Sequence, residues 1–196
     1  MKGQVLLKYI LNSDDVVSSI RDNMKDLTAL IPEINDMVGF EHNHPHHHLD
    51  VWEHTLKALS VSPNNFDIRL ALLLHDVGKP HCFQDEEVRH FRGHPVVSAH
   101  MTNDILKRLK YDGKYVDYIC EIISRHDMPL LEEHLVANMQ LSKTIFEVQK
   151  CDVLAHNPDK NTKRLEYIDT TAKMFKNITK TKNIDLVKYW FSKIMI

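Results

Sequence analysis

Apolar side chains recur every three or four residues along most of the chain, and this spacing predicts amphipathic helices. The first such face consists of Val16, Val17, Ile20, Met24 and Leu27. Asn12 or Ser13 could cap the helix that carries this face, because both side chains can accept a hydrogen bond from a free backbone N–H. Pro32 should end that helix or start another, since proline has no N–H to continue the hydrogen-bond ladder.

A loop and a short helix should follow. Pro45 and several histidines interrupt the periodicity between residues 40 and 49, which predicts a loop. Asp50 and Glu53 have the spacing of a capping box, so a helix should begin there and carry His54.

The next helix is the most apolar in the chain. It should open near Asn65 or Asp67 and continue through the stretch LLLHDVGKP, residues 72–80, until the glycine and proline stop it. This places His75 and Asp76 in the last turn of an apolar helix. Because a buried polar group costs free energy unless it is paired, these two side chains need a partner.

The rest of the chain repeats the helical pattern without a linker or an internal repeat. Further helices are expected over residues 95–109, 114–126, 130–137, 142–156, 162–178 and 184–195. The last of them would carry an apolar stripe of Leu186, Trp190 and Ile194. Only five glycines are present for tight turns, so we expect an all-α protein, a helical bundle.

Composition is that of a folded protein, with 43% hydrophobic and 27% charged residues. The three cysteines, Cys82, Cys120 and Cys151, are too widely spaced for a zinc knuckle and odd in number, so we expect reduced thiols. No signal peptide and no membrane-spanning run is recognisable, which predicts a cytoplasmic protein without a membrane partner. Residues 160–196 are basic; a solvated face is the simpler explanation and contact with an RNA backbone the alternative.

The adjacent His75 and Asp76 can converge on one ion beside their helix. An imidazole nitrogen together with a carboxylate oxygen suits a divalent transition metal, namely Mn, Fe, Co, Ni or Zn. Other ligands must come from elsewhere in the chain. The candidates are His54 on the preceding helix, Asp152 on a later one, and His94 and His126 near helix ends.

The order His54, then His75-Asp76, then Asp152 resembles the H…HD…D signature of the HD-domain metal-dependent phosphohydrolases. The segments LLHDVGKP, RGHPVVSA and IISRHDMP look like the central and auxiliary histidine motifs of that family. In addition, IPEINDM, HHHLDVWEHTLKAL and CDVLAHNP look like the HD portion of bacterial tRNA nucleotidyltransferases, the CCA-adding enzymes. The polymerase half of those enzymes has no counterpart here, so we expect no nucleotide addition.

This resemblance implies a helical HD bundle and a set of metal ligands. The primary ligands would be His54, His75, Asp76 and Asp152. Asp76 would also bridge to a second ion held by His94 and His126, so that one or two ions are bound. We expect the HD core at residues 39–157, an N-terminal helical segment at 1–38 that packs on the bundle, and C-terminal helices at 158–196 in the same domain.

Substrate contacts are expected close to these ligands. Lys79 could contact a phosphate oxygen and share the catalytic role with Asp76, although it could also be a solvated loop lysine. Arg125 and His48 are further candidates for substrate binding. The histidine run at residues 42–48 could be an ordinary surface loop, with His47 and His48 the members most suited to function because they precede His54 closely.

The expected activity is hydrolysis of a phosphomonoester or phosphodiester, such as a nucleotide, a cyclic phosphate or an RNA end, by metal-activated water. The partner would be a small phosphorylated substrate or nucleotide, with RNA also possible; the oligomeric state is left open. One alternative is a non-catalytic RNA-binding remnant of a tRNA nucleotidyltransferase in which the metal is structural. A di-iron enzyme that uses oxygen is another.

Overall fold

The computed structural model of the protein describes the backbone of residues 2–84 and 87–194 and, within these ranges, the side chains up to residue 180. These residues form ten α-helices, three short 3₁₀ turns and two isolated β-bridges. The all-α prediction is therefore confirmed. Within the described part of the chain, no helix has both the length and the hydrophobicity that crossing a membrane requires.

Three short helices, α1 (Lys2–Leu11), α2 (Val16–Asp22) and α3 (Met24–Leu30), and the 3₁₀ turn η1 (Pro32–Asp36) form the N-terminal part. The cap of α2 is Asp15, whose carboxylate accepts from the backbone N–H of Ser18 at 3.0 Å. The predicted cap at Asn12 or Ser13 is therefore wrong, because α1 extends to Leu11 and the N–H of Asn12 still bonds to its last turn.

The predicted single helix through Leu27 is also interrupted. At Asn23 the backbone leaves helical geometry, with φ −109° and ψ 15°, and its amide donates to the carbonyl of Ser19 at 2.8 Å. This local side-chain bond competes with the helical ladder and separates α2 from α3. The apolar face is nevertheless buried where it was expected, at Val16, Ile20 and Leu27.

Two capped helices lie at the centre. Asp50 accepts from the backbone N–H of Glu53 at 2.7 Å and begins α4 (Val51–Ser60) after the predicted loop. Asn65 accepts from the N–H of Ile68 at 3.1 Å and begins α5 (Phe66–Leu74). Of the two predicted starts, Asn65 is therefore the cap. α5 ends at Leu74, so His75 and Asp76 begin the following turn instead of closing the helix.

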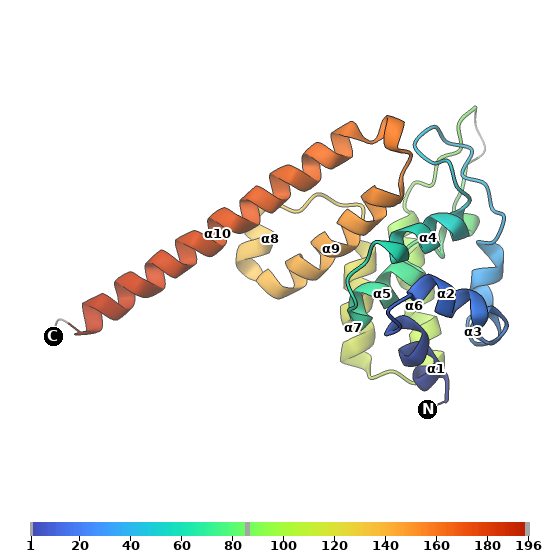
Figure 1. Ribbon diagram of the computed structural model, residues 1–196, viewed down its shortest axis with the longest axis horizontal. Helices are drawn as coiled ribbons and strands as arrows, with labels where there is room; N and C mark the ends of the chain where they lie inside the picture. Colours follow the sequence, from blue (N-terminus) through green and yellow to red (C-terminus); the bar gives the residue numbers. More distant parts are fainter. Residues whose placement is uncertain (1, 85–86, 195–196) are drawn as a thin grey trace.

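Helix α5 is the core of the bundle. Every residue from Ile68 to Leu74 is buried, which is typical of a helix surrounded by others. It contacts α1, α4, α6 (His94–Arg108), α7 (Gly113–Ser124) and α9 (Met139–Ala155). Figure 1 shows these helices gathered around it. The end of α5 therefore delivers His75 and Asp76 to a point enclosed by several other helices.

The C-terminal part consists of α8 (Glu132–Ala137), α9, the 3₁₀ turn η3 (Pro158–Lys160) and α10 (Thr162–Ile194). α10 is one continuous helix, so the prediction of two helices is wrong. Residues 178–184 contain no glycine or proline, and a lapse in hydrophobic periodicity alone does not end a helix. In Figure 1 α10 starts near α9 and continues away from the bundle. The side chains of Leu186, Trp190 and Ile194 lie outside the described ones.

The turn after α5 packs closely against the start of α6. The backbone N–H of Gly78 donates to the hydroxyl of Ser98 at 3.0 Å. A β-carbon at Gly78 would lie 2.6 Å from the backbone nitrogen of Ser98, which is a backbone clash. Glycine at this position therefore lets α6 approach Asp76 and bring His94 with it.

We expect Gly78→Ala to lower the free energy of unfolding by about 1–3 kcal/mol, because the turn and α6 must separate to admit the methyl group. Gly113→Ala is the matched control, since a β-carbon there has no neighbour within 4 Å and alanine favours a helix start. Urea denaturation of both variants tests this. Equal stability of the two would show that close packing at Gly78 is unimportant.

Candidate metal centre

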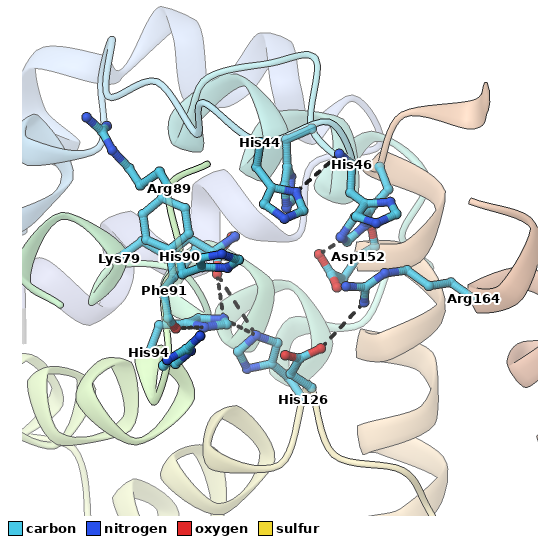
Figure 2. A pocket seen from close by; sticks show the side chains of 15 residues that line it. His44, His46, Lys79, Arg89, His90, Phe91, His94, His126, Asp152 and Arg164 are labelled. Carbon is cyan, nitrogen blue, oxygen red and sulfur yellow. Dashed lines mark hydrogen bonds and ion pairs between the residues drawn. The ribbon is translucent and has the colours of Figure 1, made fainter. Parts of the chain in front are cut away.

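Four of the six predicted ligands, Asp76, His94, His126 and Asp152, line one pocket of about 250 Å³. His54 and His75 do not line it but are buried beside Asp76 and Asp152, so all six predicted ligands lie together. They come from α4, from the turn after α5, from the start of α6, from the turn after α7 and from α9. Figure 2 shows His94, His126 and Asp152 directed toward the same space. All six are buried: His54, His75, Asp76, His94, His126 and Asp152.

The first group of donors lies between α4, α5 and α9. The His54 Nε2 is 2.7 Å from Asp152 Oδ1, and the His75 Nε2 is 3.5 Å from the same oxygen. Donors that bind one ion at about 2.1 Å lie about 3.0–3.5 Å apart. The distance from His75 to Asp152 has this spacing, whereas the contact between His54 and Asp152 is a hydrogen bond that would lengthen slightly to admit a shared cation. His54, His75 and Asp152 form one cluster whose ligand atoms lie within 4.8 Å of one another.

The two carboxylate oxygens of Asp76 face different groups. Its Oδ2 lies 3.2 Å from His75 Nε2 and 3.8 Å from His54 Nε2. Its Oδ1 lies 3.3 Å from His94 Nε2 and 4.0 Å from His126 Nε2. Asp76 therefore connects the four predicted primary ligands with the predicted second pair, and His75, Asp76 and His126 form a second cluster that could hold an ion.

Backbone carbonyls set the tautomer of three imidazoles. The Nδ1 atoms of His75, His94 and His126 donate to carbonyl oxygens three residues earlier in the chain, at 2.7, 2.9 and 2.6 Å. Because a carbonyl only accepts, Nδ1 carries the proton, and in the neutral ring Nε2 offers its lone pair to the pocket. This orientation is the usual one for histidines that bind a metal.

Several buried polar atoms of the centre lack a well-oriented hydrogen bond among the described residues. His94 Nε2 and His126 Nε2 face each other at 3.1 Å, and two lone pairs at that distance repel unless a proton or metal lies between them. Among the described residues, His75 Nε2 and both carboxylate oxygens of Asp76 are buried without a well-oriented hydrogen bond. A divalent cation would satisfy all of these atoms, so the residues present fit the metal that the sequence implies.

Electrostatics show how the charges balance without an ion. Burial would raise the pKa of Asp76, but His75 and Lys79 hold it well below its usual range. Burial would lower the pKa of His75, but the carboxylates of Asp76 and Asp152 outweigh it and raise the pKa to about 10. Burial lowers the pKa of His126 to about 3. A proton on His75 therefore occupies the place that a metal would take.

Lys79 lies in the pocket wall and is itself buried. Its Nζ is 2.7 Å from Asp76 Oδ2 and 3.1 Å from His42 Nε2, and it lies 5.5 Å from the ring centre of Phe91. Because the ammonium group has three N–H bonds, one is available beyond these two partners. Lys79 is thus not a solvated loop lysine.

The other predicted contacts lie outside the residues that line the pocket. Arg125 ends α7 and pairs with Glu121 at 3.2 Å, and His48 is exposed on the loop before α4. His47, the neighbour of His48, does line the pocket, with its ring 5.0 Å from that of His54 and 4.5 Å from that of His156. The histidine run therefore reaches the pocket, although not through His48.

Sequence reasoning missed His42, His156 and Arg164. His156 was detectable, because it lies four residues after Asp152 on the same helical face, and its Nδ1 is 3.8 Å from Asp152 Oδ1. Arg164 reaches the pocket from the first turns of α10, as Figure 2 shows, and no local pattern indicates this. His42 was visible only as part of the histidine run.

Metal binding should displace the proton from His75, so the apparent affinity for Mn²⁺ should rise about tenfold per pH unit between pH 7.5 and 9. The sign follows from the raised pKa: below about 10 the apo-protein carries this proton, and the ion must compete with it. Calorimetric titration at pH 8, in buffers with different ionisation enthalpies, should count about one proton released per ion.

His100→Gln is the control for that titration, because His100 is exposed on α6 and does not line the pocket. This variant should bind Mn²⁺ and release a proton as the parent does. An affinity that does not depend on pH over this range, or binding without proton release, would contradict the assignment of His75.

Comparison with known proteins agrees with this geometry. A family model for the HD domain matches residues 46–170. The A-adding tRNA nucleotidyltransferase of Deinococcus radiodurans is 36% identical over 136 residues, which are 63% of this chain and 31% of that protein. The CC-adding tRNA nucleotidyltransferase of Thermus thermophilus is 38% identical over 115 residues, 55% of this chain and 26% of that protein.

The chain thus spans less than a third of the length of these two relatives. The expected resemblance to the HD portion of tRNA nucleotidyltransferases is confirmed. The family model matches more than half of the chain, and the histidines and aspartates of its signature form one buried cluster. The chain therefore belongs to the HD domain family.

Proposed function

We propose that the protein is a metal-dependent phosphohydrolase that cleaves a phosphomonoester or phosphodiester, such as a nucleotide, a cyclic phosphate or an RNA end. The observation that carries this proposal is the buried cluster of four histidines and two aspartates at the base of an open pocket. Nothing in the packing of the fold requires so many polar groups in one place. Membership of the HD domain family supports the same activity.

The charge of the pocket favours an anionic substrate. Four cationic side chains line it, Lys79, Arg89, Arg92 and Arg164, against three carboxylates, of which Asp76 and Asp152 are engaged with the imidazoles. Every divalent ion would add two further positive charges. A phosphate group, with one or two negative charges and several acceptor oxygens, fits this surplus.

One or two ions of Mn, Fe, Co, Ni or Zn, held by His54, His75, Asp76 and Asp152 with His94 and His126 as the second pair, would supply Lewis-acid stabilisation and make a water molecule more acidic. The protein's own groups position the reaction. Asp76 faces both groups of donors, and Lys79 holds its Oδ2 at 2.7 Å while it keeps one N–H for a phosphate oxygen. Arg164 can bind a second phosphate oxygen from the opposite wall.

RNA is included among the substrates because the relatives from Deinococcus radiodurans and Thermus thermophilus are tRNA nucleotidyltransferases. The basic segment that begins at residue 160 would offer cations along an RNA backbone. In this proposal the chain acts in the cytoplasm on phosphorylated substrates. Arg125 and His48 do not line the pocket, so they could contact only a substrate large enough to extend beyond it.

Asp76→Asn should lower kcat for phosphate-ester hydrolysis by more than about 100-fold, because the amide keeps the shape of the side chain but removes the charge that faces both donor groups. The assay uses protein purified without a histidine tag, loaded with Mn²⁺, Co²⁺, Ni²⁺ or Mg²⁺. The substrates are 4-nitrophenyl phosphate, its bis-ester, 2′,3′-cyclic nucleotides and 5′-mononucleotides. Circular dichroism of each variant separates lost activity from lost fold.

His100→Gln serves as the control in this assay and should retain the parental kcat. Full activity of Asp76→Asn would show that hydrolysis does not use this centre. No turnover of any ester, together with unchanged RNA binding by Asp76→Asn, would indicate an RNA-binding protein with a structural metal instead. Iron in the purified protein together with oxygen consumption would indicate a di-iron enzyme.

A further inference from the structure

A second cavity of about 290 Å³ opens beside the metal pocket, between the segment that follows α7 and the first turns of α10. The two cavities share four lining residues, His126, Asp127, Asp152 and Arg164. They differ in character, because the exposed surface of the second cavity is predominantly apolar whereas that of the metal pocket is evenly mixed. One ligand could therefore extend from a polar end into an apolar one.

The apolar wall combines exposed and buried side chains. Met128 and Pro129 are exposed on the segment after α7, Val153 is buried on α9, and Tyr167 is half-buried on α10. Met128 is 55% exposed although it is a large apolar residue at the edge of a charged pocket. An exposed apolar surface that continues directly from a polar site is typical of a ligand pocket.

The polar side-chain groups of Gln149 and Tyr167 are already hydrogen-bonded to the protein. The Gln149 amide donates to the carbonyls of Arg125 and Met128 at 3.1 and 2.6 Å, and its oxygen accepts from the Tyr167 hydroxyl at 2.8 Å. The Tyr167 oxygen in turn accepts from the backbone N–H of Leu130 at 3.0 Å. These bonds hold the segment after α7 against α9 and α10. Lys163, exposed on α10, is the remaining polar side chain among the residues that line this cavity alone. The wall formed by Met128, Val153 and Tyr167 would therefore recognise its occupant by shape and apolar contact.

The boundary between the two cavities is formed by a weak ion pair. Arg164 Nη1 lies 3.5 Å from Asp127 Oδ1, and the two side chains are 39% and 46% exposed. Exposed pairs of this kind contribute little to stability, so the guanidinium can turn toward an incoming phosphate at small cost. Figure 2 shows Arg164 extending from α10 toward His126 and Asp152, where such a phosphate would lie.

We propose that the second cavity binds the organic group of the phosphate-ester substrate and that this group is a flat ring with apolar faces, such as a nucleobase, bound through its faces without selection among bases. The inference rests on the phosphohydrolase function proposed above, which supplies the phosphate end. Together the two cavities reach the size of small-molecule sites, about 300–1,000 Å³. A ring fits between Met128, Val153 and Tyr167, whereas a small polar alcohol would gain nothing there.

Phosphonates test this without turnover, because their carbon–phosphorus bond replaces the ester bond. Phenylphosphonate should bind the Mn²⁺-loaded full chain about tenfold more tightly than methylphosphonate, as measured by calorimetry. Met128→Gln should reduce this ratio to below about threefold, since it places an amide where the ring would lie. Val153→Thr should lower the ratio as well. Because Met128 is exposed, Met128→Gln should fold normally and remains a valid test even if Val153→Thr does not fold.

Leu131→Gln is the matched control, because Leu131 is 52% exposed, lies three residues after Met128 and does not line the cavity. It should keep the tenfold ratio. If neither phosphonate binds the parent protein, the proposed phosphate site itself fails. If both bind equally, or if Met128→Gln keeps the ratio, the phosphate site survives and the ring site is wrong.

The lack of selection among bases is tested separately. The values of kcat/KM for the four common 5′-mononucleotides should agree within about tenfold, because apolar stacking tolerates every base. A spread of more than about 100-fold would require hydrogen bonds to base edges and would overturn this part of the proposal. Measurement in Met128→Gln should show all four values falling together.

Discussion

Asp76 holds an ionised carboxylate that is buried among helices, and much of the bundle is arranged to compensate this charge. His54, His75, His94, His126 and Lys79 approach its two oxygens from four segments, of which the turn after α5 supplies both His75 and Lys79. A buried charge of this kind is tolerated only where opposite charges or a metal surround it. The same constraint explains why so many imidazoles face inward and why their Nε2 atoms point to one place.

The fold delivers these groups through the ends of helices. The turn after α5 carries Asp76, the first residue of α6 is His94, and His126 follows the end of α7. At a helix end the backbone turns, so an imidazole can donate Nδ1–H to a carbonyl three residues earlier and direct Nε2 outward. Gly78 then allows α6 to approach the turn after α5 closely. Rigid helices thus fix the donors, and turns orient them.

The segment after α7 serves two purposes at once. Its first residue beyond the cap, His126, belongs to the metal centre, and Met128 lines the neighbouring apolar cavity. Gln149 and Tyr167 hold this segment through hydrogen bonds to its backbone, so the distance and orientation between the two cavities are fixed. In the proposed function, a rigid support of this kind would position a phosphate and the group attached to it in the same binding event.

Local interactions determined much of this protein from its sequence alone. The 3.6-residue period identified the helices, the side chains of Asp50 and Asn65 marked two of their starts, and the order of histidines and aspartates identified six residues that meet. Each of these signals concerns residues close together in the chain or a pattern of residue types. The sequence pattern did not predict the cap at Asp15, because several polar residues near the end of α1 can compete to cap α2. It also did not predict that α10 is a single helix, since the pattern of apolar residues lapses at residues 178–184 although no glycine or proline ends the helix there.

Only the tertiary structure decided which distant groups share the pocket. Arg164 enters it because η3 redirects the chain after α9, and His42 meets Lys79 because the loop before α4 folds over the turn after α5. The apolar cavity also depends on three segments, residues 126–129, 149–153 and 163–167, that are not adjacent in the sequence. Such contacts arise from the packing of whole helices, in which small changes of angle move a side chain by several ångströms, and no local period or spacing encodes them.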